Sequence, residues 1–139
     1  MSIWTNIKTY FLFRRIRRTG LDFPHSCKIH GVKPPDRQGA LAQSGDGDEL
    51  QIVHVPTKDY PFNTYVYSIP LNRILGYLDK RLSEQLVYVF GKGFCRDGEI
   101  ESILGGTPDY SYFGCRIRIF ITKEMMQDCD DISHLFGGR

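Results

Sequence analysis

The sequence lacks the features that would place it in a membrane or in several large enzyme classes. It has no run of about 18 apolar residues, the length that a membrane-spanning helix needs. It also lacks the GxSxG, HExxH, GxGxxG and Walker A motifs of common hydrolases, metalloproteases and nucleotide-binding enzymes. We therefore expect a protein that spans no membrane, catalyses no reaction and carries no cofactor.

Cysteines are few, and no two of them form a CxxC pair. The four are Cys27, Cys95, Cys115 and Cys129. The apolar cluster at residues 10–13 is too short for a secretory signal, and arginines follow it rather than precede it. The histidines near Cys27 and Cys129 do not give the paired short spacings of a zinc site, so no metal is predicted. We predict an intracellular protein with free thiols, cytoplasmic or associated with the nucleus or nucleoid.

Positive charge is scarce except at the N-terminus. Residues 1–37 carry eight Lys and Arg against two acids, a net charge of +6, whereas the remaining residues carry ten against fourteen, a net charge of −4. This distribution excludes a protein that coats nucleic acid with its whole surface, but it allows a local basic patch. The 139 residues, 41% of them hydrophobic, suffice for one folded domain.

Residues 1–24 form a basic amphipathic segment. Its apolar residues have roughly helical spacing, four arginines crowd residues 14–18, and Gly20 is a suitable helix end. Cations near the C-terminal end of a helix also interact favourably with its dipole. Two interpretations stay open: a terminal helix packed on the domain, or a basic helix that lies on a membrane or nucleic-acid surface.

Residues 25–123 show alternating strand patterns interrupted by short helical ones. The predicted strands are 26–32, 49–55, 64–69, 73–78, 97–104 and 115–122. A short helix is expected at 36–43 with Asp36 as its N-cap, and a second follows Asp79, with buried Leu82, Leu86 and Val89, and ends at Gly91. The pattern predicts a small six-stranded OB-like or antiparallel β-barrel with two or three short helices. Residues 124–139 are an acidic C-terminal tail.

Five individually weak motifs follow one another between residues 27 and 122. They are a short helix with an acidic glycine turn, a strand, the loop PTKDYPFN, the corner LGYLDKR and the late strand CRIRIFI. In this order and spacing they resemble the HIRAN domain family. The resemblance implies an OB-type barrel, found with helicase-like remodelling enzymes, that holds the 3′ end of single-stranded DNA. Aromatic side chains stack on bases in such sites, and cations contact the phosphates.

The resemblance assigns roles to particular residues. Tyr60 is the loop aromatic that stacks on a base or sugar, and Tyr77 lines the same pocket from the corner. Lys80 contacts a phosphate at the start of its helix, and Arg37 matches a basic residue of the short helix. The candidate nucleic-acid-binding residues are Arg37, Lys58, Asp59, Tyr60, Tyr77, Lys80 and Arg81. Each also has a purely structural interpretation, as loop packing, pocket wall or solvated helix turn.

The loop departs from the family pattern at the position that receives the strand end. The family's acid after the loop tyrosine, which accepts a hydrogen bond from a 3′-hydroxyl, is Pro61 here. The preceding Asn-Pro is Lys58-Asp59, so Asp59 is the alternative source of a carboxylate. Thr64 replaces the usual alanine.

We therefore predict a non-catalytic module that binds single-stranded DNA or, as the second choice, RNA. No translocase motor is present in the 139 residues, so any remodelling activity would come from a partner chain, and a helicase or a nuclease is the partner we expect. The alternative is a protein-interaction or scaffold domain that has kept the barrel and lost end recognition. The net charge of −4 after residue 37 and the proline at position 61 favour that alternative.

Overall fold

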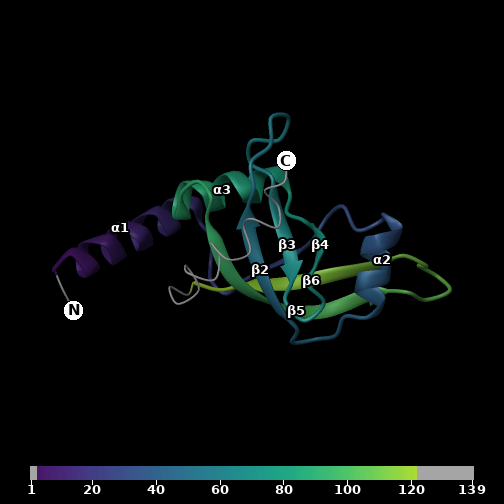
Figure 1. Ribbon diagram of the computed structural model, residues 1–139. Helices are drawn as coiled ribbons and strands as arrows, with labels where there is room; N and C mark the ends of the chain where they lie inside the picture. The colour runs from purple at the N-terminus through teal and green to yellow at the C-terminus, as the bar shows by residue number, and fades with distance from the viewer. Residues whose placement is uncertain (1–2, 122–139) are drawn as a thin grey trace.

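The computed structural model describes residues 3–121 and, from residue 7 onward, their side chains; the predicted tail 124–139 lies outside the described residues. Its centre is one antiparallel sheet with the strand order β1-β6-β5-β2-β3-β4 (Figure 1). The strands are β1 His25–Lys28, β2 Glu49–His54, β3 Thr64–Ser68, β4 Arg73–Tyr77, β5 Cys95–Gly105 and β6 Phe113–Ile119. The helices are α1 Ile3–Thr19, α2 Pro35–Ala42 and α3 Lys80–Phe90. The prediction of a small six-stranded, barrel-like antiparallel fold with two or three helices is confirmed.

The sheet curls, and its two edges meet between the segment after β1 and the end of β4. Register shifts between Val66 and Tyr67 and between Ile100 and Ser102 mark irregularities that bend and twist strands. Just after β1, the His30 N–H donates to Tyr77 O at 2.8 Å, and the Tyr77 N–H donates to His30 O at 2.9 Å. This single bridge joins the segment after β1 to β4, so the two edges of the half-barrel meet at the corner.

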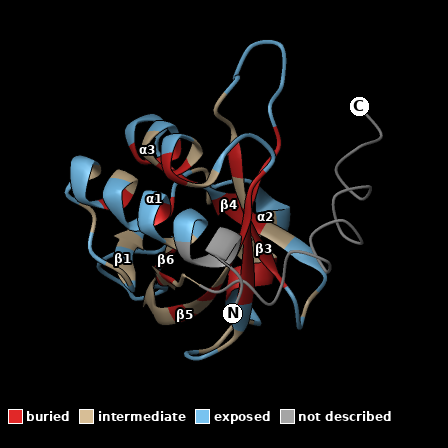
Figure 2. Ribbon diagram, turned by 90° about the vertical axis from the view of Figure 1, so that its left-hand side faces the viewer, coloured by how far each residue is buried: buried red, intermediate tan, exposed pale blue. Residues whose placement is uncertain are grey.

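The hydrophobic core lies between the concave side of the sheet and the helices α2 and α3. Its fully buried side chains include Leu41, Ile52, Leu75, Leu86 and Ile117. β2 and β3 are buried almost along their whole length, as the red strands of Figure 2 show. Burying one such aliphatic side chain contributes about 1.5–3 kcal/mol, so the packed strands hold the loops at their ends firmly.

The ends of α3 agree with the sequence prediction, and the start of α2 does not. Asp79 Oδ1 accepts a hydrogen bond from the Leu82 N–H at 2.8 Å, and Gly91 ends the helix with φ at 94°. The prediction of Asp36 as the N-cap of α2 is wrong: the N-cap is Pro34, and Asp36 lies in the first helical turn. The first helical residue is Pro35, and proline suits this position because its missing N–H would have no partner there in any case.

Helix α1 packs on the C-terminal half of α3. Leu12 and Ile16 are buried against Val89, and the Arg15 Nε–H donates to Val89 O at 3.0 Å. The described part of segment 1–24 thus contains a helix that packs on the domain, with Arg15 and Arg18 in contact with α3. None of the helices in residues 3–121 is both long and apolar enough to cross a membrane.

The cysteines differ from the prediction at one position. Cys27 and Cys115 are free thiols, as expected. Cys95 is disulfide-bonded, so the prediction that all the cysteines are free is wrong for this residue. Its side chain is buried on β5.

Candidate nucleic-acid interface

A pocket of about 640 Å³ lies where the β2–β3 loop, the β4–α3 corner and the start of α2 meet. We call it the loop–corner pocket. Its lining consists of Arg37, Asp59, Tyr60, Pro61, Phe62, Asn63, Tyr65, Tyr77, Leu78, Lys80 and Ser83. The structure thus brings together five of the seven candidate residues. Lys58 and Arg81 are exposed and do not belong to the lining.

Short-range hydrogen bonds shape the tip of the β2–β3 loop, which rises beside α3 in Figure 1. Three hydrogen bonds join Thr57 and Tyr60: the Tyr60 N–H donates to Thr57 Oγ1 at 3.0 Å, and Tyr60 O accepts from the Thr57 N–H at 3.0 Å and from Thr57 Oγ1 at 3.4 Å. Asn63 closes the base of the loop, because its Nδ2–H donates to Val55 O at 3.1 Å. The Tyr60 backbone is fixed while its side chain stays 71% exposed, so the ring is free to contact a ligand.

A buried histidine anchors the same loop to the barrel. The Gly93 N–H donates to His54 Nδ1 at 2.8 Å, and Pro61 O lies 2.8 Å from His54 Nε2. Because Nδ1 is an acceptor, the neutral ring carries its proton on Nε2 and donates it to Pro61 O. The ring also stacks on Phe94, with centroids 5.8 Å apart. The carbonyl of Pro61 therefore holds the loop to His54, at the position where the HIRAN-like pattern has an acid.

Two glycines make the corner possible. A Cβ at Gly76 would overlap the backbone oxygen of His30, and a Cβ at Gly31 would overlap the ring of Tyr77. Gly31 also has φ at +68°, a value that other residues rarely adopt. Its carbonyl oxygen accepts a hydrogen bond from Arg37 Nη1 at 2.7 Å. Gly31 thus positions both the aromatic ring and the guanidinium of the pocket.

The first turn of α3 contributes one cation and one hydroxyl to the pocket. Lys80 is exposed and lies 3.9 Å from Glu84 one turn later, a distance at which an exposed pair is weak. Ser83 is buried in the lining, and its Oγ has no hydrogen-bond partner among the described residues. Lys80 and the Ser83 hydroxyl can contact an anion at this end of the pocket, while the N-cap carboxylate of Asp79 offsets the partial positive charge of the helix start.

The charges that line the pocket come from the helices and the loop, since no residue of β1 belongs to its lining. Burial lowers the pKa of His25, an effect that Asp22 and the Asp79 carboxylate oppose. Burial raises the pKa of the Cys27 thiol to about 12, and Asp79 adds to that rise. Within the described lining, two cations, Arg37 and Lys80, face one carboxylate, Asp59.

Several residues that build the pocket escaped the sequence analysis. His54 was assigned only to a strand, because strand alternation cannot show that a ring bonds a loop carbonyl seven residues away. Gly31 gave no signal, since its contact with Tyr77 joins segments 46 positions apart. Phe62 and Ser83 also line the pocket, and a loop phenylalanine and a helix serine carry no signal in a single sequence.

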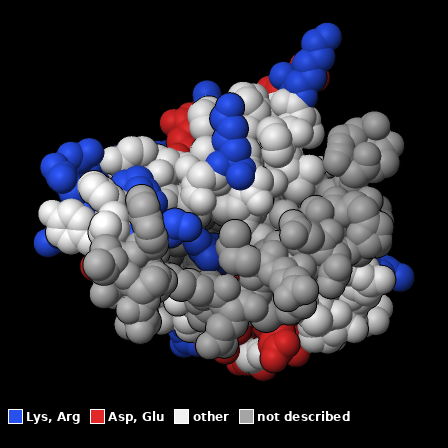
Figure 3. Space-filling model, turned by 60° about the vertical axis from the view of Figure 1, so that its left-hand side comes forward, with Lys and Arg blue, Asp and Glu red and all other residues white. Residues whose placement is uncertain are grey.

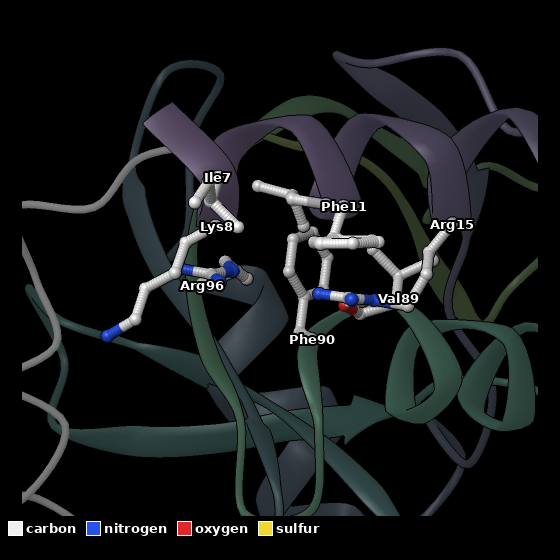
Figure 4. A pocket seen from close by; sticks show the side chains of 8 residues that line it. Ile7, Lys8, Phe11, Arg15, Val89, Phe90 and Arg96 are labelled. Atoms are coloured by element: carbon white, nitrogen blue, oxygen red, sulfur yellow. Dashed lines mark hydrogen bonds between the residues drawn. The ribbon is translucent and has the colours of Figure 1, made fainter. Parts of the chain in front are cut away.

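A second cavity, of about 490 Å³, lies at the other end of α3, beneath α1 (Figure 4). Its lining consists of Ile7, Lys8, Phe11, Leu12, Arg15, Val89, Phe90 and Arg96. The Arg96 guanidinium lies over the Phe90 ring, 4.0 Å from its centroid, in a cation–π contact. Burial lowers the pKa of Arg96, which the nearby Asp97 partly offsets. We call this space the α1–α3 cavity.

The residues 3–121 contain no group of three or more His, Cys, Asp or Glu side chains arranged to hold a metal ion. No family model, curated protein or solved structure matches the chain. The interpretation of the loop–corner pocket therefore depends on its geometry and chemistry.

Proposed function

We propose that this chain is a non-catalytic nucleic-acid-binding module that holds single-stranded DNA in the loop–corner pocket. The observation that carries the proposal is the convergence of two solvent-exposed tyrosines and two cations on one pocket of about 640 Å³. Tyr60 and Tyr77 are 71% and 40% exposed, although large aromatic side chains usually lie in the core. Their positions are fixed by backbone bonds and by Gly31, which reduces the entropy lost when a ligand binds.

The two tyrosines supply stacking surfaces, each worth about 1–3 kcal/mol per base. Lys80 and Arg37 neutralise phosphates on either side of the corner. Asp59 provides the carboxylate that accepts a hydrogen bond from a sugar hydroxyl. With Asp59 in that role, the module receives the free 3′ end of the strand even though Pro61 stands at the family's acidic position.

The likeness of the loop, corner and late strand to HIRAN domains supports this function, because that family binds strand ends through an aromatic and basic site. A remodelling helicase or a nuclease is the partner that such a module serves, since it would be directed to strand ends.

Binding of a labelled single-stranded oligonucleotide, followed by fluorescence anisotropy at about 50 mM salt, tests the proposal, because phosphate contacts remain strong at that concentration. We expect the Tyr60→Ala and Tyr77→Ala variants each to bind about 5- to 150-fold more weakly, which corresponds to one lost base stack. Affinity should also fall steeply as salt rises. Absence of binding by the unmodified chain at low salt would reject the proposal.

A matched control separates stacking from the general loss of a surface aromatic. Tyr110 is 55% exposed in the β5–β6 loop and is not part of the pocket lining. Tyr110→Ala should therefore leave the affinity unchanged. Oligonucleotides with a 3′-hydroxyl, a 3′-phosphate or a blocked 3′ end complete the test. If all three bind equally well, single-strand binding stands, but Asp59 does not recognise a free 3′ end.

A further inference from the structure

Arg81 is exposed next to the pocket without lining it, and its place on α3 indicates where a bound strand could continue. Residues at i, i+4 and i+7 share one face of a helix, so Arg81, Gln85 and Tyr88 form a stripe along α3. From Arg81 to Tyr88 the stripe is about 10 Å long, at 1.5 Å per residue. Tyr88 is 45% exposed, which leaves a third aromatic ring accessible on this side of the protein.

The far end of the stripe meets the last turn of α1. The Gln85 Nε2–H donates to Thr19 O at 3.4 Å, and Arg18 Nη1 donates to the Tyr88 hydroxyl at 3.4 Å. Arg14 and Arg17 lie four and one residues before Arg18 and are exposed as it is. The three arginines share a helix face because they are spaced by three and four residues. Arg18 is thereby brought alongside α3, and Arg14 and Arg17 extend the basic charge over the exposed face of α1, opposite the face of Leu12 and Ile16 that packs on α3.

The stripe carries one cation, Arg81, and the last turns of α1 carry three exposed ones, Arg14, Arg17 and Arg18. Within residues 3–121, no carboxylate forms an ion pair with Arg14, Arg17, Arg18 or Arg81. The single acid within α3 is Glu84, which already lies near Lys80. Figure 3 shows Lys and Arg side chains scattered over one side of the molecule, with Asp and Glu side chains near its top and bottom.

We infer that this surface is a second contact for the same ligand: a single strand whose end lies in the loop–corner pocket continues over α3 to α1. We call the surface formed by Arg81, Tyr88, Arg14, Arg17 and Arg18 the α3–α1 track. Its chemistry fits a polyanionic strand, because cations spaced along a path meet successive phosphates and Tyr88 supports a base between them. The inference rests on the proposed function and adds to it a longer binding site and a role for the N-terminal arginines.

The length of the oligonucleotide separates the track from the pocket. Single strands of about 4 and about 16 nucleotides span the range of site sizes known for one barrel of this type. The variant with Arg14→Gln, Arg17→Gln and Arg18→Gln should bind the short strand as the unmodified chain does. It should bind the long strand at least tenfold more weakly. The slope of log K against log salt for the long strand should fall by about 2, since each lost contact to single-stranded nucleic acid contributes about 0.7.

Two control variants of the 139-residue chain make the test specific. Lys28→Gln, Lys33→Gln and Arg73→Gln remove the same charge from exposed positions off the track, and should leave the length dependence unchanged. Replacing the three α1 arginines with lysine keeps the charge and should keep the salt slope. Circular dichroism checks that α1 is still folded in each variant.

The inference would be overturned if the glutamine variant bound the long strand with the same affinity and the same salt slope as the unmodified chain. Equal weakening for the short and long strands would overturn it too, because the arginines would then act on the pocket or through net charge alone. If the unmodified chain binds neither strand, the proposed function fails and the track fails with it. Binding of both lengths with no loss in the glutamine variant rejects the track alone.

Discussion

The two ends of α3 differ in how far the side chains around them are buried. At its N-terminal end, aromatic and basic side chains remain exposed around the loop–corner pocket, and the backbone beneath them is fixed by hydrogen bonds and by Gly31. At its C-terminal end, Val89 is buried under Leu12 and Ile16 of α1. The first end keeps apolar surface available at a cost in stability, whereas the second uses apolar surface to hold a helix. Exposed aromatic side chains on a fixed backbone are what the proposed binding role requires of the first end.

The largest expected effect is at the packing end. Ile16→Ala should lower the free energy of unfolding by about 2–5 kcal/mol, because it removes buried methyl groups and leaves a cavity between α1 and α3. Chemical denaturation measures this change. Binding of a short oligonucleotide, at a temperature where the variant is folded, should stay the same.

Ile7→Ala is the matched control, since Ile7 lies on the same helix but is 41% exposed. Its effect should stay within about 0.5 kcal/mol, as is usual for surface positions. The comparison breaks down if Ile16→Ala unfolds no more easily than the unmodified chain, because α1 would then add nothing to the packing. It also breaks down if the folded variant loses affinity for the short strand.

A smaller effect, but one on binding, is expected at Gly31. Gly31→Ala and Gly20→Ala both force a residue with a side chain into a positive φ, +68° and +76°, at a cost of about 1–2 kcal/mol each. Only the Cβ at position 31 meets the Tyr77 ring, whereas no atom lies within 4 Å of one at position 20. We therefore expect Gly31→Ala to lose more stability than Gly20→Ala, which carries the positive-φ cost alone. Only Gly31→Ala should weaken short-strand binding, by about 5- to 150-fold, the equivalent of one lost base stack.

The double variant Gly31→Ala, Tyr77→Ala sharpens this test. Removing the ring relieves the overlap, so the double variant should regain part of the stability lost by Gly31→Ala and still bind weakly. Equal affinities for Gly31→Ala and Gly20→Ala would show that Tyr77 does not depend on Gly31 for its position, and the pocket would lose its proposed pre-organisation.

Much of the fold could be predicted from the sequence because its signals are local. Alternation identified the strands, and the capping role of Asp79 followed from an acid placed just before a helical stripe. The start of α2 was misplaced because Asp36 and the preceding prolines both resemble helix starts, and only the backbone decides between them. The disulfide of Cys95 could not be foreseen, since wide spacing alone does not say which cysteines meet.

The candidate site was predicted less completely, for a geometrical reason. Lys80 and Arg81 are adjacent in sequence but about 100° apart around the helix, so one lines the pocket and the other lies exposed outside its lining. Lys58 is two residues from Tyr60, yet the turn from Thr57 to Tyr60 keeps it out of the lining. The contacts of His54 and Gly31 join distant segments, and no pattern in a single sequence reports such contacts.

Photo-crosslinking tests the central claim most directly, because it reports which side chains touch a bound base. A single strand carrying 5-iodouracil near its 3′ end would be irradiated with the unmodified chain, and the linked peptides identified by mass spectrometry. The account predicts crosslinks to the peptides that contain Tyr60 and Tyr77, lost when a competing unlabelled strand is added. Crosslinks confined to other exposed aromatics, such as Tyr110 or Tyr112, or no specific crosslink at all, would contradict it.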